Sequence, residues 1–233
     1  WKSQQGCSVA YSHMAATVYN NRAYVIGGLD KQVGIECQVY TSENNSWLFE
    51  FPSLPKGRFN SVCFVYRDSL YVFGGTDNSS NMNEIVRYDL STQNSGEWTT
   101  IAKVNEANQR GGVAFVVEDK VYAGLGEKSN GIRNGFYVSS DSLTKWELIP
   151  SIPAQLGVIS SGVYDEQKKS FFMIDNDGKI WEYNLTTEQW TSRSLWIRMK
   201  NYHMFMLDGS IYILGQDIYQ KNKFTVYNPI WDN

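Results

Sequence analysis

A short apolar segment that ends in glycine recurs along the chain and restricts its possible folds more than any other feature. Two copies match closely, Ala23-Tyr-Val-Ile-Gly-Gly28 and Leu70-Tyr-Val-Phe-Gly-Gly75. Weaker copies occupy residues 121–126, 171–176 and 211–216. Successive copies lie roughly 40–50 residues apart, a period that is typical of arrays of similar units. Because one such unit is too small to bury a core alone, we expect the units to pack against one another.

Each repeat carries the features of four strands. An apolar run precedes each glycine segment, and turn residues such as Asn20-Asn21 and Asp208-Gly209 separate the two. A further run that ends in tyrosine follows, and then a tryptophan. The tryptophans recur in phase at Trp47, Trp98, Trp146 and Trp190. Four short strands in each repeat predict an all-β fold of the β-propeller class.

The glycine pair, followed by a tyrosine and a tryptophan at set distances, resembles the kelch motif. Tyr40 and Trp47 have the same spacing as Tyr183 and Trp190. The first two repeats fit the motif well, whereas the glycine pair becomes Leu-Gly, Asp-Asn and Gly-Gln in the last three. The resemblance covers nearly the whole chain and implies a kelch-like propeller. It implies structural roles for the consensus residues and does not identify a ligand.

We expect residues 1–233 to form one domain of five four-stranded blades. The predicted blades span approximately 11–51, 58–102, 110–150, 158–197 and 201–230, with 1–8 added to the last. Tyr227 is followed too soon by Trp231 for a fourth strand, while Trp1 stands before the first blade at the spacing of a fourth-strand tryptophan. We therefore predict that the N-terminal strand, Trp1–Ser8, pairs with Phe224–Tyr227 and closes the ring. A fragment of a larger ring is the alternative, because kelch propellers more often have six or seven blades.

Composition excludes several classes of protein. The chain is 42% hydrophobic and 19% charged, which favours a globular core over disorder. Its net charge is −3 and it has no basic block, so we predict no nucleic-acid partner. It has no run of 18 apolar residues, so we predict no membrane span. The oligomeric state does not follow from the sequence.

The three cysteines do not form a disulfide framework. Cys63 lies in an apolar run and is expected to be a small buried residue. A disulfide between Cys7 and Cys37 remains open, as does the state of both thiols. With only His13 and His203 and no Cys-x-x-Cys pair, we predict no metal site and no cofactor.

Two features of the sequence bear on where the protein is located. Glycosylation sequons occur at Asn44, Asn78 and Asn184, and the loops are polar but poorly charged. These features favour an extracytoplasmic or secreted protein, with a cytoplasmic one as the alternative.

No enzyme motif stands out. The chain has no Gly-x-Ser-x-Gly elbow, P-loop or His-Glu-x-x-His sequence. Asp175-Asn-Asp-Gly178 resembles the start of a calcium loop, but it lacks the later ligands and is better interpreted as a hairpin turn.

Candidate binding residues fall at two places in the repeats. The entrance of each predicted first strand and the residues just beyond it carry Tyr11, Arg58, Asn60, Arg110, Lys200, Asn201 and His203. Cations around one axis would attract an anionic ligand. The alternative is that the arginines bind backbone carbonyls between blades. The loops after the second strands, 77–83 with Asp77 and 127–134 with Arg133, belong to a class of loop that commonly binds partners.

The favoured function is therefore non-catalytic binding of a protein or a glycan through loops on one propeller face. The alternative is a carbohydrate-modifying enzyme that resembles the kelch-type sialic-acid epimerases. Such an enzyme needs a general acid or base, and cations that hold a carboxylate.

Overall fold

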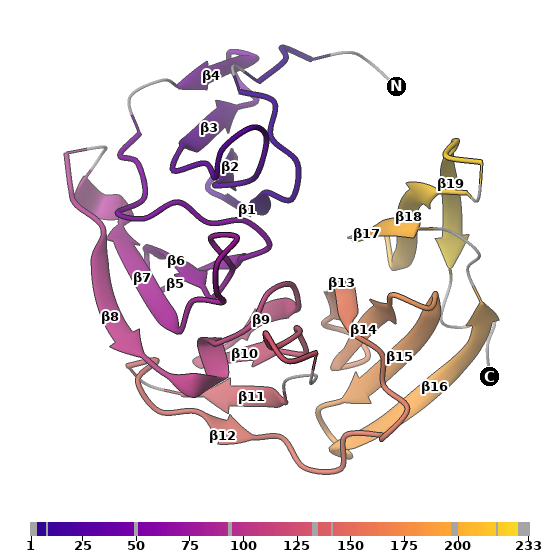
Figure 1. The fold of residues 1–233 in the computed structure, drawn as a ribbon. Coiled ribbons are helices and arrows are strands. Elements are labelled where there is room, and N and C mark those ends of the chain that lie inside the picture. The colour runs from indigo at the N-terminus through magenta and orange to yellow at the C-terminus, as the bar shows by residue number, and fades with distance from the viewer. Residues whose placement is uncertain are drawn as a thin grey trace. The chain divides into compact units, whose positions relative to one another are not determined.

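The computed structural model describes residues 4–7, 9–48, 51–92, 95–131, 135–140, 142–196, 200–217 and 219–227. It omits the side chains of residues 160, 194–196 and 200. The described chain is all-β apart from two short 3-10 helices, η1 (Leu90–Thr92) and η2 (Asn105–Ala107). It divides into two compact units, Trp1–Glu147 and Leu148–Asn233 (Figure 1).

Unit 1 contains three antiparallel four-stranded blades, each formed by consecutive strands (Figure 1). The first consists of β1 (Ala15–Tyr19), β2 (Arg22–Ile26), β3 (Cys37–Thr41) and β4 (Ser46–Leu48). The second consists of β5 (Val62–Tyr66), β6 (Ser69–Phe73), β7 (Glu84–Asp89) and β8 (Thr99–Lys103). The third consists of β9 (Val113–Val117), β10 (Lys120–Gly124), β11 (Phe136–Ser139) and β12 (Glu147–Leu148), which ends just past the unit boundary.

Unit 2 contains the last two blades. The fourth consists of β13 (Ile159–Asp165), β14 (Ser170–Asp175), β15 (Lys179–Asn184) and β16 (Gln189–Trp196). The fifth consists of β17 (Lys200–Leu207), β18 (Ser210–Gln216) and β19 (Asn222–Tyr227), so its described residues form three strands rather than four. The prediction of an all-β propeller with five blades is confirmed. The single-domain boundary of 1–233 stays a prediction.

Apolar side chains from neighbouring blades form the core inside each unit. In unit 1, Ile26 and Val39 of the first blade pack with Val72 and Val86 of the second. The aromatic residues predicted to recur also pair, since the rings of Tyr183 and Trp190 lie 4.9 Å apart across β15 and β16. Burial of such alternating faces is the main force that holds stacked blades together.

The glycine pairs occupy places where no side chain fits. Gly74 has φ of +65°, and a Cβ there would lie 2.5 Å from the carbonyl oxygen of Ala107. Gly27 has φ of +63°, and a Cβ added there would lie 2.2 Å from the carbonyl oxygen of Arg58. In both cases the chain leaves its second strand against the backbone that leads into the next blade. The structural role that the kelch resemblance implies for these glycines is therefore a close approach of two backbone segments, which only a residue without a side chain permits.

The predicted strand at the N-terminus is not found among the described residues. Residues 4–7 lie outside any strand, and Trp1–Ser3 and Ser8 lie outside the described residues. The Trp47 indole donates to the Gln5 carbonyl oxygen at 2.9 Å, and the Gln5 amide donates to Asn45 Oδ1 at 2.9 Å. Side-chain hydrogen bonds therefore hold this segment against the first blade, which corrects the expected strand pairing.

The cysteines are all free thiols, so the Cys7–Cys37 disulfide does not form here. Cys63 is buried as expected, and burial raises the pKa of its thiol to about 12. The sequence Asp175–Gly178 forms the turn between β14 and β15, where Asp175 accepts hydrogen bonds from the amides of Asp177 and Lys179. The hairpin interpretation of this segment is therefore confirmed.

Candidate binding face

In unit 1, the strand entrances and the loops after the second strands lie together. The residue that precedes each first strand forms an isolated β-bridge with a residue that follows the second strand. These bridges join Ser12 with Leu29, Phe59 with Thr76, and Arg110 with Glu127. Because the bridge repeats in all three blades, it brings the two sets of predicted binding residues to the same end of each blade.

Backbone hydrogen bonds link the three entrances to one another. The Asn60 amide donates to the His13 carbonyl oxygen at 2.9 Å, and the Gly111 amide donates to the Asn60 carbonyl oxygen at 2.7 Å. All three residues have positive φ, between 50° and 69°. The structure thus gives the Asn60 backbone a linking role, and the asparagine suits the left-handed conformation better than most residues.

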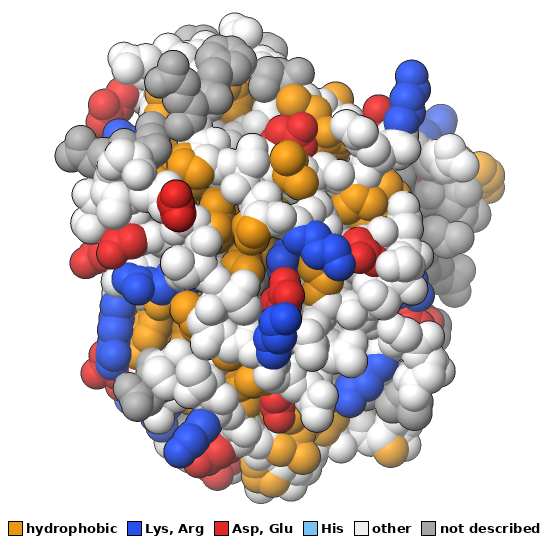
Figure 2. Space-filling model, turned by 60° about the vertical axis from the view of Figure 1, so that its left-hand side comes forward, with side chains coloured by type: hydrophobic (Ala, Val, Ile, Leu, Met, Phe, Trp, Pro, Cys, Tyr) orange, Lys and Arg blue, Asp and Glu red, His pale blue; other side chains and the backbone are white. Residues whose placement is uncertain are grey.

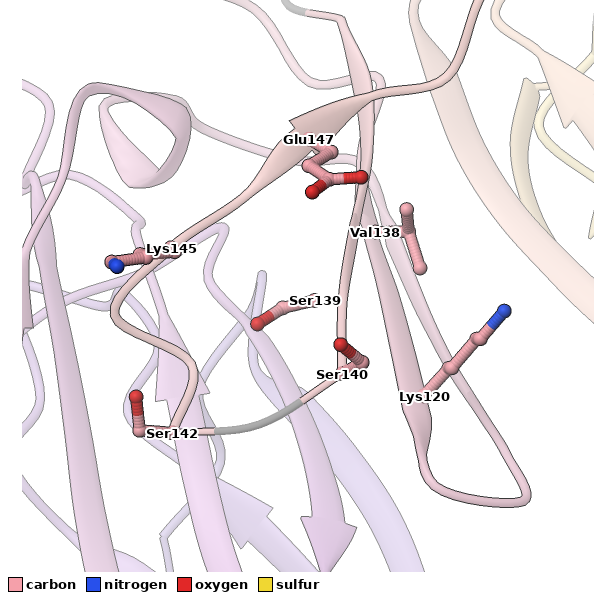
Figure 3. Close-up of a pocket in the computed structure, with 7 residues that line it drawn as sticks. All are labelled: Lys120, Val138, Ser139, Ser140, Ser142, Lys145 and Glu147. Atoms are coloured by element: carbon pink, nitrogen blue, oxygen red, sulfur yellow. The ribbon is translucent and has the colours of Figure 1, made fainter.

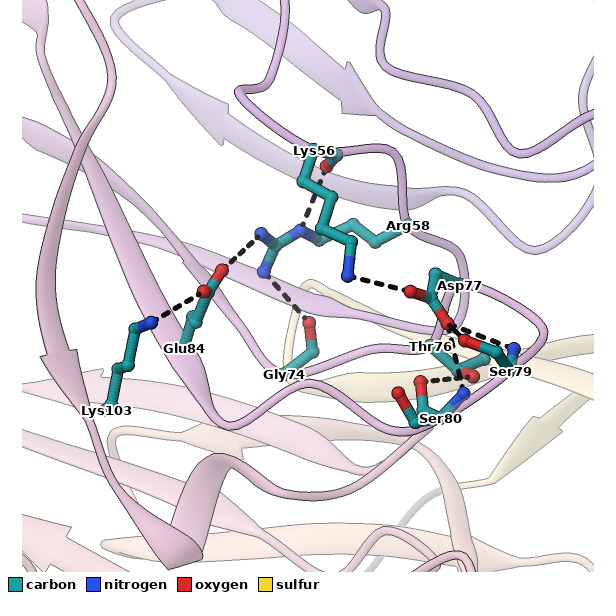
Figure 4. Close-up of polar contacts among 9 residues, drawn as sticks. All are labelled: Lys56, Arg58, Gly74, Thr76, Asp77, Ser79, Ser80, Glu84 and Lys103. Atoms are coloured by element: carbon teal, nitrogen blue, oxygen red, sulfur yellow. Dashed lines mark hydrogen bonds and ion pairs between the residues drawn. The ribbon is translucent and has the colours of Figure 1, made fainter.

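Arg58 lies in the interior of unit 1, with none of its surface exposed. Its Nη1 donates to the Gly74 carbonyl oxygen at 3.2 Å, and its Nη2 lies 3.4 Å from Glu84 Oε2 (Figure 4). Burial lowers the pKa of the guanidinium, and the nearby Glu84 carboxylate counters that effect. Arg58 thus binds a backbone carbonyl, as in the structural alternative, but this carbonyl belongs to its own blade and not to a neighbouring one.

Arg110 does not occupy the position equivalent to Arg58, although the repeat pattern predicts both residues at the entrance of a first strand. The Gly28 amide donates to the Arg58 carbonyl oxygen, and the equivalent Gly75 amide donates to the carbonyl oxygen of Gln109. Gln109 is buried like Arg58. Arg110 therefore stands one residue further along, where the second blade has Phe59, and its side chain is half-exposed.

Arg110 forms a surface ion pair that extends to the second blade. Its Nε and Nη2 donate to Glu127 Oε2 at 3.0 and 2.8 Å. The carbonyl oxygen of Glu127 accepts a hydrogen bond from Asn81 Nδ2 at 2.9 Å. The loop after β6 and the loop after β10 are thereby joined side by side.

Asp77 organises the loop after β6. Its Oδ1 accepts hydrogen bonds from the amides of Ser79 and Ser80, both at 3.0 Å, and from the Ser79 hydroxyl at 2.6 Å. Its Oδ2 lies 2.7 Å from Lys56 Nζ (Figure 4). Lys56, followed by Ser79 and Ser80, holds the pKa of this carboxyl well below its usual range. The predicted loop residue is therefore a fixed carboxylate with its acceptor sites in use.

Tyr11 borders the same end of the first blade. A Cβ on Gly34 would lie 2.6 Å from the Tyr11 ring, so the glycine leaves room for it. Desolvation, followed by the hydrogen bond to the Glu36 carboxylate, raises the pKa of the Tyr11 phenol.

Two predicted residues of unit 2 line a pocket of about 380 Å³ in the fifth blade. Asn201 and His203 share it with Leu214, Gly215, Gln216, Asn222 and Lys223. Asn201 Nδ2 donates to Gln216 Oε1 at 3.1 Å. The Lys200 backbone pairs with Gln216 in the strand ladder, and its side chain lies outside the description. Arg133 also lies outside the described residues.

A further pocket of about 380 Å³ lies in the third blade of unit 1, at residues that no sequence motif singles out. It is lined by Lys120, Val138, Ser139, Ser140, Ser142, Lys145 and Glu147. Lys120 and Lys145 stand on opposite sides of the opening and point away from one another (Figure 3). Its charged groups therefore do not converge on one ligand position.

The sequence reasoning missed Glu84, Gln109 and Glu127. Two of them are partners of predicted residues, because Glu84 pairs with Arg58 and Glu127 pairs with Arg110. Gln109 stands as far from Trp98 as Arg58 stands from Trp47, so an equal spacing from the tryptophan would have identified it.

The described residues contain no group of three or more His, Cys, Asp or Glu that could hold a metal ion. Within the same residues, no helix has the length and apolar composition that a membrane crossing requires.

Comparisons with known proteins agree on the repeat type. Kelch-like protein 36 of Mus musculus is 27% identical over 165 residues, which cover 66% of this chain and 26% of that protein. Kelch repeat and BTB domain-containing protein 1 of Ectromelia virus is 25% identical over 227 residues, which cover 92% of this chain and 39% of that protein. The chain thus spans about a quarter to two fifths of the length of these relatives.

A solved structure described as the structure of YjhT shares the fold. It superposes with a TM-score of 0.76 at 16% identity, and the match covers 94% of this chain and 84% of that one. The family model of the KLHDC2/KLHL20/DRC7 Kelch-repeats domain matches residues 3–156, which is more than half of the chain. With the five blades and the glycine positions described above, this match shows that the chain belongs to the kelch-repeat family of β-propellers.

Proposed function

We propose that the chain is a protein-interaction module that binds its partner through one polar face of unit 1. We call this the loop face and define it as Arg110 with residues 77–81 and 127–131. Kelch-repeat propellers commonly serve as protein-interaction modules, and the relatives named above are kelch proteins.

The observation that carries the proposal is that hydrogen bonds already hold these loops in fixed conformations. Asp77 fixes the first loop through Ser79 and Ser80, and Asn81 joins it to Glu127 of the second. A loop that holds its conformation before binding loses less conformational entropy when a partner arrives. Exposed residues such as Ser79 and Ser129 then present hydrogen-bonding groups at fixed positions.

The charge pattern favours a partner with a mixed polar surface. The acidic groups of the loop face, Asp77 and Glu127, are each paired with a cation, Lys56 and Arg110. On the side of the molecule in Figure 2, Lys and Arg side chains likewise lie beside Asp and Glu, so neither sign of charge dominates this surface. A face of this kind selects partners by local complementarity more than by long-range attraction.

The test compares proteins retained from a cell lysate by the immobilised chain and by two variants. The loop-face variant carries Ser79→Arg and Ser129→Arg, and the matched control carries Ser42→Arg and Asn44→Arg in the exposed turn between β3 and β4. We expect quantitative mass spectrometry to find proteins that the wild type and the control retain and the loop-face variant loses. Equal retention by all three chains would contradict the proposal.

A glycan ligand is a second candidate, and the fifth-blade pocket favours it. Amide side chains of Asn201, Gln216 and Asn222 stand there beside His203 and Lys223. Such groups match the hydroxyls and carboxylates of sugars. A glycan array probed with the wild type and with Asn222→Ala tests this candidate, which predicts a signal that the variant lacks.

The enzyme alternative gains no comparable support. None of the relatives named above has the name of an enzyme. The buried Arg58, which would have to hold a substrate carboxylate, is engaged by Gly74 and Glu84.

A further inference from the structure

The third blade contains a buried side-chain donor that lacks an acceptor. Gln109 is 1% exposed, and its Oε1 accepts a hydrogen bond from the Gly126 amide at 2.7 Å. Its Nε2 is buried as well, and no atom in the described part of the chain accepts a hydrogen bond from it. Because a buried donor has lost its bonds to solvent, native proteins rarely leave one unpaired. Gln109 Nε2 therefore requires an acceptor.

Gln109 occupies a place that two other blades fill with a residue bonded to a glutamate. Tyr11, Arg58 and Gln109 each precede the residue that forms the isolated β-bridge at a first-strand entrance. The Tyr11 phenol forms a hydrogen bond with the Glu36 carboxylate. Arg58 Nη2 lies 3.4 Å from Glu84 Oε2 (Figure 4). In both blades the entrance residue thus contacts a carboxylate where the third strand begins.

The third blade has a glycine in the place of that glutamate. In the second blade the Gly74 amide donates to the Glu84 carbonyl oxygen at 3.2 Å, and the first blade has the equivalent bond. In the third blade this bond runs from the Leu125 amide to the Gly135 carbonyl oxygen, at 3.0 Å. Leu125 and Gly74 also share a φ of 65°. Since Gly135 has no side chain, the third blade lacks the carboxylate that the other two blades place beside the entrance residue.

The chemistry of this place favours a small neutral acceptor. The Nε2 group of a glutamine only donates, so it offers nothing to a metal cation. A buried anion needs a cation beside it, and the third blade has Gln109 where the second blade has the buried Arg58. Arg110, the next residue, is already paired with Glu127. A water molecule is neutral and can accept the bond from Nε2.

A water molecule in this place also needs an acceptor for its own hydrogens. Gly74 indicates where one lies, because its carbonyl oxygen accepts a hydrogen bond from Arg58 Nη1 at 3.2 Å. Leu125 has the position of Gly74 in the third blade, so its carbonyl oxygen is the equivalent acceptor. A donor and an acceptor on two sides meet the minimum that an internal water requires.

We propose that a buried water molecule takes the place of the missing carboxylate in the third blade. It accepts a hydrogen bond from Gln109 Nε2 and donates one to the Leu125 carbonyl oxygen. The water thereby links the first-strand entrance to the rest of the blade, as the contact between Arg58 and Glu84 does in the second blade.

The experiment detects this water by NMR in the full chain. A buried water stays beside the Gln109 side-chain amide long enough to give a cross-relaxation signal with the sign of a long-lived contact, and rotating-frame spectra separate it from proton exchange. Gln167 is exposed and serves as the control in the same spectrum. Gly135→Glu restores the carboxylate, which should accept the bond from Nε2 and displace the water. Ser129→Glu is the matched control, because it adds the same charge at an exposed position of the same loop.

We expect a long-lived water signal at the Gln109 amide and none at Gln167. Gly135→Glu should lose this signal and Ser129→Glu should keep it. A crystal structure of the wild type should show the water about 3 Å from Nε2, and this measurement decides the question even if Gly135→Glu does not fold. The proposal is overturned if the wild type has no long-lived water at Gln109, if a protein atom accepts the bond from Nε2 in the crystal, or if folded Gly135→Glu keeps the signal.

Discussion

Arg58 Nη2 stands 3.4 Å from the carboxylate oxygen of Glu84, in a place where the arginine side chain has no exposed surface. Removing the arginine deletes a fully buried, paired side chain and leaves the partly buried Glu84 carboxylate with only Lys103 Nζ, 3.5 Å away, as its cation. Arg58→Ala also leaves the Gly74 carbonyl oxygen without its side-chain donor. We expect this variant to lose about 3 kcal/mol of unfolding free energy, measured by urea denaturation.

Arg110→Ala is the matched control for that measurement. Its ion pair with Glu127 is half-exposed, and such pairs contribute less than about 1 kcal/mol. A similar loss in both variants would contradict the structural role of Arg58.

Gly74→Ala tests the close approach between the second and third blades. A Cβ would lie 2.5 Å from the Ala107 carbonyl oxygen, in addition to the strain of φ at +65°. We expect a loss of roughly 3 kcal/mol in thermal or urea unfolding. Gly131→Ala has positive φ and open space around its Cβ, so it should lose only about 1 kcal/mol. Equal losses would show that the blades separate easily here.

Trp146→Ala tests the in-phase tryptophans. Its ring contacts Phe73 of the second blade at 5.2 Å, and its indole donates to the Leu143 carbonyl oxygen at 2.9 Å. We expect the unfolding free energy to fall by about 3 kcal/mol, with Trp146→Phe falling less. A loss of unfolding free energy below about 1 kcal/mol in the alanine variant would show that Trp146 does not contribute to the packing between blades.

Asp77→Asn tests the carboxylate of the loop face through pH. The pKa of Asp77 is lowered in the folded chain, so its stabilising effect is present above the unfolded value near 4 and disappears as the pH falls below it. The wild type should therefore exceed the variant in stability at neutral pH, and the difference should shrink progressively in acid. Urea midpoints from neutral pH to about pH 2 measure it. A difference that does not vary with pH would contradict the assignment.

The features that the sequence predicted well are local ones. Glycine segments, turn residues and alternating apolar runs act within one hairpin, so they locate the first three strands of all five blades. The Tyr183–Trp190 pair follows from the spacing of two residues across one turn.

The features that could not be predicted from the sequence depend on contacts between segments that lie far apart in the chain. The one-residue error at Arg110 arose because arginine was matched with arginine, whereas an equal spacing from the tryptophan places Gln109 at the position of Arg58. The N-terminal segment was misplaced because its Gln5 backbone accepts a hydrogen bond from the Trp47 indole and donates one to Asn45 Oδ1. Such bonds leave no periodic pattern in the sequence, so the alternation of apolar and polar residues cannot predict them. Glu84 and Glu127 gave no motif because each acts through basic side chains that folding brings near.

The most direct test of the protein-binding account is amide hydrogen exchange with the partner present. It uses a protein that the wild type retains from lysate and the loop-face variant does not. The account predicts slower exchange at residues 77–81 and 127–131 in the complex, and unchanged exchange in the turn at 42–45. Protection confined to other parts of the chain, with none at 77–81 or 127–131, would contradict it.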